Sequence, residues 1–368
     1  MKIPISRTEL TQEEFEIIKK PIESGWVVQG PYVKDFENKF SEFTEAKHSI
    51  AVTSCTSALH LSLAALGFKA GDEAIVPAFT WISTANIIEH LGGRVIFCDI
   101  DPETFNIDIS QIESLITSKT KAILPVHLFG LAADMDPILN LAKKYNLWIV
   151  EDAACGFGSK YKEKHVGTIG DTGCFSFHPR KAITTGEGGM ITTNDDALAK
   201  KMRSMRDHGA DLSDFQRHHG AKPYFLSEYP FAGYNYRLTD IQASIGLTQM
   251  DRANEIVSER KKIAKTYNNK LSDLNFFQLP YKNNNFSHSF QSYPCLFNYK
   301  EISLMNIEKI KNRRNEFMDF LQNKGVSTRP ATHAVHMLRY YKEKYHLESE
   351  DYPNAYIANE ASISFPLF

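Results

Sequence analysis

Residues 174–189 have the sequence Cys174-Phe-Ser-Phe-His-Pro-Arg-Lys-Ala-Ile-Thr-Thr-Gly-Glu-Gly-Gly189. The apolar residues at the start of this stretch predict a short buried strand, and the glycines at its end predict a tight turn. Lys181 lies between the two, so the backbone on either side holds its side chain in a defined direction. Because most lysines are surface residues, the rest of the chain must decide whether Lys181 has a chemical role.

The stretches on both sides of residues 174–189 predict the fold class. Apolar runs alternate with amphipathic stretches from residue 48 to about residue 195. The expected strands are 49–53, 73–76, 94–98, 121–126, 147–150, 174–177 and 190–193, and the expected helices are 57–66, 84–90, 109–116 and 135–145. This alternation predicts an α/β fold with a mostly parallel, seven-stranded sheet that helices cover on both faces.

The chain has 368 residues, which is enough for about two domains. We expect a large domain over residues 1–245 and a smaller C-terminal α+β domain over residues 246–368, linked by a long helix from Thr239 to about Asn268. Residues 207–236 lack periodicity, which predicts a long loop that is functional or reaches a neighbouring subunit.

The composition excludes several classes of protein. A formal net charge of -2 gives no basis for binding nucleic acid or an anionic membrane surface. The five cysteines are scattered and form no CxxC pair, which argues against a disulfide framework and a zinc site. The first residues lack the apolar core of a signal peptide, and no apolar run approaches the ~18 residues of a membrane span. We therefore expect a cytoplasmic protein without a bound metal, a nucleic-acid partner or a membrane partner.

A second candidate for chemistry is Asp152, which ends the apolar run Leu147-Trp-Ile-Val-Glu-Asp152. Parallel sheets bind their ligands at the carboxyl ends of the strands, where both Asp152 and Lys181 are expected. A buried carboxylate needs a cationic partner there, because an unpaired buried charge is costly. A protonated pyridine ring would serve as that partner, and a lysine that forms a Schiff base would complete a pyridoxal phosphate enzyme. The alternatives are a capping role for Asp152 and a solvated turn for Lys181, while Glu151 is expected to be structural.

Three further segments could hold the phosphate and the ring of this cofactor. The segment Thr53-Ser-Cys-Thr-Ser-Ala-Leu59 joins a strand to a helix. Hydroxyls and amides at a helix N-terminus bind phosphate, although N-capping is an equally common role for them. Ser176 lies five residues before Lys181 and could reach the same phosphate. Trp81 follows another strand end and could stack on a flat ring or fill the core.

Other site patterns are absent or incomplete. No GxGxxG follows the first strand and neither GxxxxGKS nor GxxxxGKT occurs, which excludes the common nicotinamide and P-loop sites. His333 and His336 have no cysteine or carboxylate neighbours in the sequence pattern, so a metal site is not expected.

The motifs of this chain resemble those of the DegT/DnrJ/EryC1/StrS family, the pyridoxal phosphate-dependent nucleotide-sugar aminotransferases. They are Glu-Asp-Ala-Ala at 151–154, Ser-Phe-His-Pro-Arg-Lys at 176–181, Gly-Glu-Gly-Gly at 186–189 and Gly-Tyr-Asn-Tyr-Arg-Leu at 233–238. The resemblance extends from Gly25 to His336. It implies the fold type I of aspartate aminotransferase and a homodimer whose active sites lie at the subunit interface.

The resemblance also implies roles for individual residues. Lys181 would form the Schiff base with pyridoxal phosphate, Asp152 would bind the pyridine nitrogen, and Trp81 would stack on the ring. The residues implied to bind the phosphate or to lie beside the cofactor are Thr56, Ser57, Cys155, Ser176 and, from the neighbouring subunit, Asn235. The residues implied to lie near the sugar nucleotide are Arg329 and His336.

The implied function is the transfer of an amino group from an amino acid, by resemblance L-glutamate, to a keto group of a nucleotide-linked deoxysugar. A sugar dehydratase of the same family is the nearest competing function, but those members carry histidine at the position of Lys181. The sequence also leaves open a transaminase of a smaller keto phosphate and a non-catalytic regulatory protein. The nucleotide, the sugar and the aminated carbon do not follow from the sequence.

The chain departs from the family at two positions near the expected cofactor. The family usually has glycine at the position of Cys55, and glutamine or histidine at the position of Cys155. The first difference places a side chain in an expected tight turn, and the second removes a hydrogen-bonding group. The family also tends to continue with a final helix after the Phe-Pro-Leu stretch, where this chain ends at Phe368.

Overall fold

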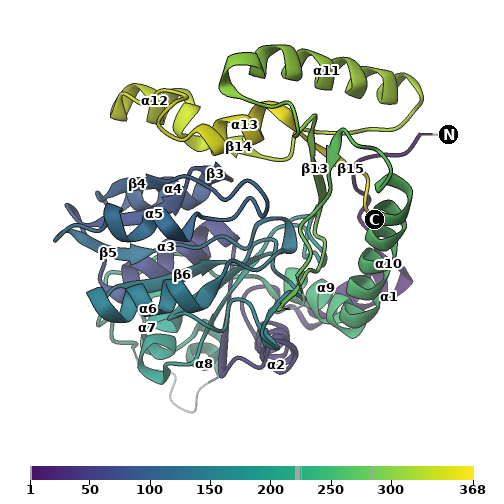
Figure 1. Cartoon of the computed structure of the whole chain (residues 1–368). Helices are drawn as coiled ribbons and strands as arrows, with labels where there is room; N and C mark the ends of the chain where they lie inside the picture. Colours follow the sequence, from purple (N-terminus) through teal and green to yellow (C-terminus); the bar gives the residue numbers. More distant parts are fainter. Residues whose placement is uncertain (1, 220–223, 225, 284) are drawn as a thin grey trace.

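The molecule is built on a seven-stranded sheet between two layers of helices (Figure 1). The computed structural model describes residues 2–368 except 220–223, 225 and 284. The strands of the sheet, in spatial order, are β1 (His48–Val52), β10 (Gly189–Thr193), β9 (Thr172–Ser176), β6 (Trp148–Asp152), β5 (Thr120–Ile123), β2 (Glu73–Pro77) and β4 (Arg94–Cys98). β10 is antiparallel to both of its neighbours, and the other neighbouring pairs are parallel. The predicted α/β fold with a mostly parallel, seven-stranded sheet is confirmed.

Successive strand residues face the two helix layers in turn, as the pleat of a strand requires. The helices of the first layer are α3 (Cys55–Leu66), α4 (Ser83–His90) and α7 (Asp196–Arg206), and those of the second are α2 (Pro31–Thr44), α5 (Ile109–Leu115) and α6 (Met135–Tyr145). On β6, for example, Val150 packs in the core of the first layer and Ile149 in the core of the second. Strands buried on both faces are therefore continuously apolar, which is why the sequence pattern revealed them.

The predicted helices of these layers occur with small shifts at their ends. α6 has the predicted bounds, whereas α3 begins two residues earlier than predicted because Ser54 caps its start. The Ser54 side chain accepts a hydrogen bond from the backbone N–H of Ser57. Asp108 and Asp195 cap α5 and α7 in the same way, so local capping chemistry fixes where these helices start.

The long helix predicted from Thr239 to about Asn268 is two helices, α9 (Asp240–Asp251) and α10 (Ala253–Leu271). They meet at Arg252, whose side chain donates a hydrogen bond of 2.9 Å to Glu14 on α1 (Gln12–Ser24). The predicted domain boundary between residues 245 and 246 falls inside α9, which packs against α1 and α2.

The chain beyond α10 forms a smaller α+β part. Its elements are the antiparallel strands β11 (Phe277–Gln278), β13 (Tyr293–Phe297) and β15 (Ser362–Phe365) and the helices α11 (Ile307–Asn323), α12 (Arg339–Tyr345) and α13 (Pro353–Ala361). This part is joined to the large sheet by β14 (His333–Ala334), which pairs with β3 (Phe79–Thr80) just after β2. Tyr341 on α12 adds a hydrogen bond of 2.7 Å to Asn86 on α4. The C-terminal part is thereby fixed beside Trp81, the residue that follows β3.

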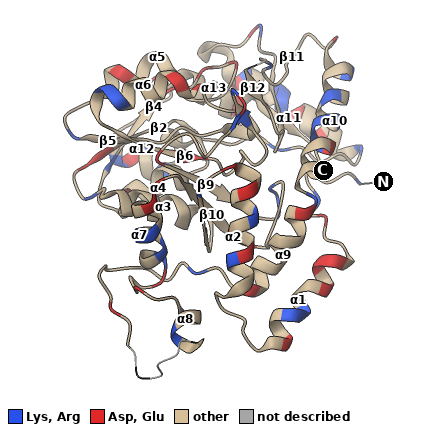
Figure 2. Ribbon diagram, turned by 90° about the horizontal axis from the view of Figure 1, so that it is seen from below, with Lys and Arg blue, Asp and Glu red and all other residues tan. Residues whose placement is uncertain are grey.

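The remaining elements are short. They are the three-stranded sheet of β7 (Lys160–Tyr161), β8 (Lys164–His165) and β12 (Phe286–Ser287), the helix α8 (Asp214–His219) and the 3₁₀ turns Leu128–Gly130, Leu304–Asn306 and Val335–Met337. The predicted 207–236 loop contains α8, and its residues 220–223 and 225 lie outside the described part of the chain. Lysines and arginines are interspersed with aspartates and glutamates over the ribbon (Figure 2). Within the described residues, no helix has both the length and the apolar character needed to cross a membrane.

Candidate active site

The carboxyl ends of β6 and β9 bring the two main candidate residues to one edge of the sheet. β6 ends at Asp152, and the neighbouring β9 ends at Ser176, five residues before Lys181. The turn that carries Lys181 is closed by a backbone hydrogen bond of 2.9 Å from Phe177 N to Gly188 O. The backbone therefore fixes the position of Lys181, as the flanking strand and glycines predicted.

The Lys181 amine lies among thiols and one carboxylate. Its Nζ is 3.2 Å from the Sγ of Cys155. Burial lowers the pKa of the Lys181 amine, but Cys155 first, and then Cys55 and Asp152, raise it, and the resulting pKa is above the ordinary lysine value. The amine is therefore charged at neutral pH in this arrangement, and it must lose its proton before it can form a Schiff base.

Asp152 is buried and keeps much of its hydrogen-bonding capacity free. Its side chain faces the first helix layer and is 3% exposed. One carboxylate oxygen accepts a hydrogen bond of 2.6 Å from the Oγ1 of Thr84, and the other accepts one of 3.1 Å from the backbone N–H of Ala154. A carboxylate can accept about four hydrogen bonds, so lone pairs remain for a cationic ligand. Thr84, which lies three residues after Trp81, was not identified from the sequence.

Glu151 faces the opposite side of the sheet, and its carboxylate has no lone pair left for a ligand. It accepts hydrogen bonds from His127 Nε2 (2.8 Å) and from the backbone N–H groups of Gly167 (2.7 Å), Ile169 (2.8 Å) and Gly170 (2.7 Å). His127 donates through Nε2 because its Nδ1 accepts from the Ala133 N–H at 3.1 Å. Burial raises the pKa of Glu151, but the bonds from His127 and the backbone lower it, and the net shift is below the ordinary value. These contacts support the structural role expected for Glu151.

The start of α3 presents the expected phosphate-binding groups at the same edge. Thr56 and Ser57 lie half-buried in the first turn of this helix of 12 residues. The Oγ of Ser57 is 2.9 Å from the hydroxyls of both Thr53 and Ser54. The half-buried Oγ of Ser176 accepts a hydrogen bond of 3.4 Å from the His178 N–H. Free N–H groups at a helix start attract anions, so this cluster suits a phosphate.

Cys55 fits the turn before α3 without backbone strain. It is the first residue of the helix, its thiol is buried, and its φ is not positive. The close packing of β10 against the start of α3 instead depends on Gly189 on β10. A Cβ atom at this position would lie 2.4 Å from the carbonyl carbon of Ser54. Cys55, where the family usually has glycine, is therefore accommodated, because the glycine that this close packing requires is Gly189 on the neighbouring strand.

Trp81 lies at the surface of this edge and is 54% exposed. Its ring centroid is 5.8 Å from that of His333, because β14 pairs with β3 and places His333 opposite Thr80. An indole this exposed does not fill the core, so its face is available to a ligand. His333, which sequence reasoning considered only as a metal ligand, is the histidine that the structure brings to Trp81.

Asn235 is exposed on a segment whose backbone is firmly held. Tyr234 N donates to Met205 O (2.6 Å), and Tyr236 N donates to Arg206 O (3.0 Å). The rings of Tyr234 and Tyr236 stack 5.0 Å apart and both lie against His60 on α3. Asn235 lies between these two tyrosines and is itself exposed.

The two residues predicted to lie near the sugar nucleotide occupy different environments. Arg329 is exposed, and its backbone pairs with that of Ser364. His336 is fully buried, with its ring centroid 4.9 Å from that of Tyr352, and burial lowers its pKa to about 4. The structure therefore places His333 rather than His336 beside Trp81, and a substrate contact for His336 stays a prediction.

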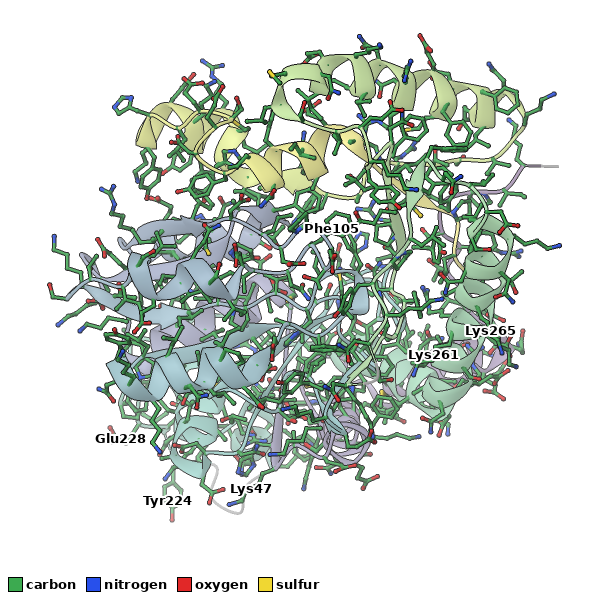
Figure 3. The ribbon with its side chains drawn as sticks, viewed as in Figure 1. Lys47, Phe105, Tyr224, Glu228, Lys261 and Lys265 are labelled. Carbon is green, nitrogen blue, oxygen red and sulfur yellow. The ribbon has the colours of Figure 1, made fainter. Side chains whose placement is uncertain are left out.

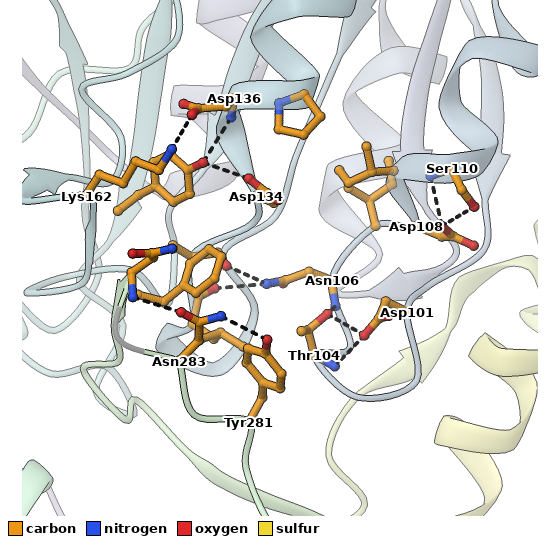
Figure 4. A pocket seen from close by; sticks show the side chains of 18 residues that line it. Asp101, Thr104, Asn106, Asp108, Ser110, Asp134, Asp136, Lys162, Tyr281 and Asn283 are labelled. Carbon is orange, nitrogen blue, oxygen red and sulfur yellow. Dashed lines mark hydrogen bonds and ion pairs between the residues drawn. The ribbon is translucent and has the colours of Figure 1, made fainter.

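A separate cavity of about 590 Å³ lies on the side of α5 and α6 (Figure 4). Its charged lining consists of four aspartates and one lysine, namely Asp101, Asp108, Asp134, Asp136 and Lys162. An acidic lining repels phosphate, and this cavity contains none of the predicted site residues. In the described part of the chain, no group of three or more metal-ligating side chains could hold a metal ion.

Comparison with known proteins identifies the class to which this geometry belongs. The model of the DegT/DnrJ/EryC1/StrS aminotransferase family matches residues 8–368. The chain belongs to this family. A GDP-perosamine synthase of Caulobacter vibrioides is 38% identical over 95% of this chain and 89% of its own length.

Two solved structures show the same fold. A proposed sugar aminotransferase of Streptococcus pneumoniae, Spr1654, in its pyridoxal phosphate form, superposes with a TM-score of 0.89 at 28% identity over 100% of this chain and 94% of that one. The GDP-4-keto-6-deoxy-D-mannose-3-dehydratase of Escherichia coli superposes with a TM-score of 0.86 at 26% identity over 100% of this chain and 95% of that one. The family resemblance and the aspartate aminotransferase-like fold are confirmed, and the chain is a pyridoxal phosphate-dependent aminotransferase.

Proposed function

We propose that this family member transfers an amino group from L-glutamate to a keto group of a nucleotide-linked deoxysugar at the site around Lys181. The observation that carries the proposal is the Lys181 amine at the same sheet edge as the buried Asp152 carboxylate. The relative that is a GDP-perosamine synthase supports a sugar nucleotide as the class of substrate.

The residues at this edge fit pyridoxal phosphate. The start of α3 offers N–H groups and hydroxyls to the phosphate, and Ser176 offers a further hydroxyl. Asp152 offers anionic lone pairs to a protonated pyridine nitrogen, and Trp81 offers an exposed ring face. When bound, the cofactor supplies a carbonyl carbon that condenses with amines and a ring that withdraws electrons from the reacting carbon.

We assign proton transfer to Lys181. Its Nζ would accept a proton from the α-carbon of the amino donor and deliver a proton to the carbon of the sugar that receives the amine. Cys155 holds Nζ in place at 3.2 Å, where the family usually has glutamine or histidine. Hydrogen bonds from Thr84 and Ala154 hold the Asp152 carboxylate in place toward the predicted position of the pyridine nitrogen.

The substrate is proposed to enter beside Trp81 and His333. Both side chains are exposed and come from the paired strands β3 and β14, next to the predicted position of the cofactor ring. Arg329, also exposed, would bind a phosphate of the nucleotide, because a guanidinium forms paired hydrogen bonds with phosphate.

A homodimer with shared active sites is part of the proposal. Exposed apolar residues gather before the Asn235 segment, among them Tyr224, Leu226 and Tyr229. Figure 3 shows Tyr224 and Glu228 at the periphery of the molecule. Large exposed apolar side chains mark protein contacts. A second subunit would cover these side chains, and Asn235 would reach the phosphate of the cofactor bound in that subunit. Sedimentation velocity should show a dimer, whereas a fully active monomer would contradict shared sites.

We also propose a cytoplasmic location. All five cysteines lie in the described part of the chain and are free thiols. Free thiols, four of them buried, suit a reducing compartment.

No observation favours a dehydratase, a keto phosphate transaminase or a regulator. The dehydratase among the structural relatives shares the fold, so the fold cannot separate dehydration from amino transfer. Lys181 separates them, because the dehydratases of this family carry histidine at its position. A smaller keto phosphate would leave the exposed His333 beside Trp81 without a substrate contact. A regulator would not require a lysine amine and a buried carboxylate at one edge of the sheet.

Turnover with defined substrates tests the proposal. The protein loaded with pyridoxal phosphate is incubated with L-glutamate and a GDP-, UDP- or dTDP-linked keto sugar, and 2-oxoglutarate is measured. One of the three sugars should give 2-oxoglutarate and amino sugar in equal amounts. Lys181→Ala should abolish turnover, while Lys162→Ala, at an exposed lysine of the acidic cavity, should keep it. Normal turnover by Lys181→Ala, or no product from any of the sugars, would contradict the proposal.

A further inference from the structure

Thr84 links the two residues proposed to contact the cofactor ring. It lies in the first turn of α4 and is fully buried. Its Oγ1 is 2.6 Å from a carboxylate oxygen of Asp152 and 3.2 Å from the backbone oxygen of Trp81. The backbone N–H of Thr84 also donates to the same Trp81 oxygen, at 3.3 Å.

The chemistry of the hydroxyl decides which of the two contacts it donates to. A threonine hydroxyl has a single hydrogen, and a hydrogen bond to an ionised acceptor is shorter and stronger than one to a neutral carbonyl. The shorter contact is the one to Asp152, so the hydroxyl donates there. The Trp81 backbone oxygen then accepts a hydrogen bond from the Thr84 backbone N–H. Thr84 thus holds both the Asp152 carboxylate and the turn at Trp81.

We propose that Thr84 is a positioning residue for the cofactor ring. Its hydroxyl holds the Asp152 carboxylate in one orientation and leaves the remaining lone pairs for the pyridine nitrogen. Its backbone holds the turn that presents Trp81. The inference rests on the cofactor site of the proposed function, and it assigns a role to a residue that contacts neither substrate nor cofactor.

A matched threonine elsewhere in the sheet separates this role from simple packing. Thr172 begins β9, at the opposite end of that strand from Ser176, and is 1% exposed. Its Oγ1 has no hydrogen-bond partner in the described part of the chain. Substituting valine at Thr172 therefore removes a buried hydroxyl of the same kind without affecting Asp152.

The test compares Thr84→Val, Thr84→Ser and Thr172→Val as purified proteins freed of cofactor and titrated with pyridoxal phosphate. Thr84→Val should bind the cofactor about tenfold more weakly, since a hydrogen bond to a charged group is lost. The pH profile of the visible absorbance of its bound cofactor should shift relative to the wild type, because Asp152 holds the ring proton less firmly. Thr84→Ser should restore both properties, and Thr172→Val should match the wild type. The melting temperatures of the cofactor-free proteins show that the variants are folded.

Three results would overturn the inference. Thr84→Val could bind cofactor with wild-type affinity and an unchanged absorbance profile. Thr84→Ser could be as impaired as Thr84→Val, which would show that a hydroxyl at this position does not restore cofactor binding. Thr84→Val could fail to fold, which would make the role purely structural. A wild-type protein that binds no pyridoxal phosphate would instead contradict the proposed function, so the two failures are distinguishable.

Discussion

Glu151 and Asp152 are adjacent carboxylates on one strand that face opposite helix layers. Both are buried, yet Glu151 accepts four hydrogen bonds from the protein and Asp152 accepts two. On the Glu151 side, donors from His127 and the 167–170 loop leave no place for a ligand. On the other side, the Asp152 carboxylate keeps free lone pairs at the sheet edge where Lys181 and the start of α3 lie. The number of protein donors, rather than burial, separates Glu151 from Asp152, the carboxylate that we propose binds the cofactor.

The largest effect should follow from neutralising the functional member of this pair. Asp152→Asn keeps the shape but removes the charge that, in the proposed function, would hold the pyridine nitrogen protonated. We expect turnover to fall by about 1,000-fold, as when a preorganised electrostatic contact is lost. Steady-state kinetics with saturating cofactor measure this loss, and the melting temperature without cofactor should stay within a few degrees of wild type. If the turnover of Asp152→Asn were within tenfold of the wild-type value, Asp152 would not have the functional role proposed for it.

Neutralising Glu151 should have the reverse effect, a loss of stability with little change in turnover. Glu151→Gln places an amide where three backbone N–H groups need an acceptor. We expect the free energy of unfolding to fall by about 3 kcal/mol, as when one partner of a buried charged cluster is removed. Urea unfolding measures the loss, while turnover per folded molecule should stay near the wild-type value. If this variant were stable but inactive, Glu151 would have a catalytic role that its contacts do not show.

Acid should weaken the Glu151 side of the sheet through His165. This buried ring is neutral, since Nδ1 donates to Val166 O at 2.6 Å and Nε2 accepts from Gly158 N at 2.9 Å. Burial lowers the pKa of His165 to about 4, below the value of about 6.5 in an unfolded chain. The unfolded chain therefore binds more protons between these two pH values, and stability falls as pH falls through that window.

The expected contribution of His165 is about 2 kcal/mol of unfolding free energy lost between pH 8 and pH 5. Urea titrations at both pH values should show a smaller pH dependence for His165→Gln by this amount. His346→Gln, at an exposed histidine, should behave like the wild type. The stabilisation that accompanies the lowered pKa of Glu151 is lost in a lower pH window, only below about pH 4.5. Equal pH dependence in the His165 variant and the wild type would show that another group controls acid stability.

The smallest effect is expected at Cys155, on the Asp152 side. Its thiol contacts the Lys181 amine, but thiols are weak hydrogen-bonding groups. Cys155→Ala should change turnover by about fivefold at most, and Cys155→Gln, the residue common in the family, should stay at least as active as Cys155→Ala. Kinetics of both variants at saturating glutamate measure this. A loss as large as that of Asp152→Asn would make Cys155 part of the proton-transfer machinery.

The sequence predicted the residues whose positions depend on strand ends and turns. Lys181 and Asp152 followed from apolar runs and the rule that ligands bind at carboxyl ends of strands. Thr84 did not, because its contact with Asp152 spans 68 residues and depends on the order β6-β5-β2 in the sheet.

The C-terminal part shows the same limit. Family motifs pointed to His336, which is buried and whose substrate contact stays a prediction, and they gave no sign that the short β14–β3 pairing places His333 beside Trp81. Two strand residues are too few to give a sequence pattern. The break between α9 and α10 at Arg252 was also missed, because the contact of Arg252 with Glu14 is long-range.

Reductive trapping of the cofactor tests the central claim most directly. Borohydride added to the protein loaded with pyridoxal phosphate converts a Schiff base to a stable amine, and peptide mass spectrometry locates the modified lysine. The structure predicts a single pyridoxyl group on Lys181 in the wild type, and none at this position after Lys181→Ala. Stoichiometric modification of a different lysine, or none in a protein that binds the cofactor and turns over, would contradict the active site described.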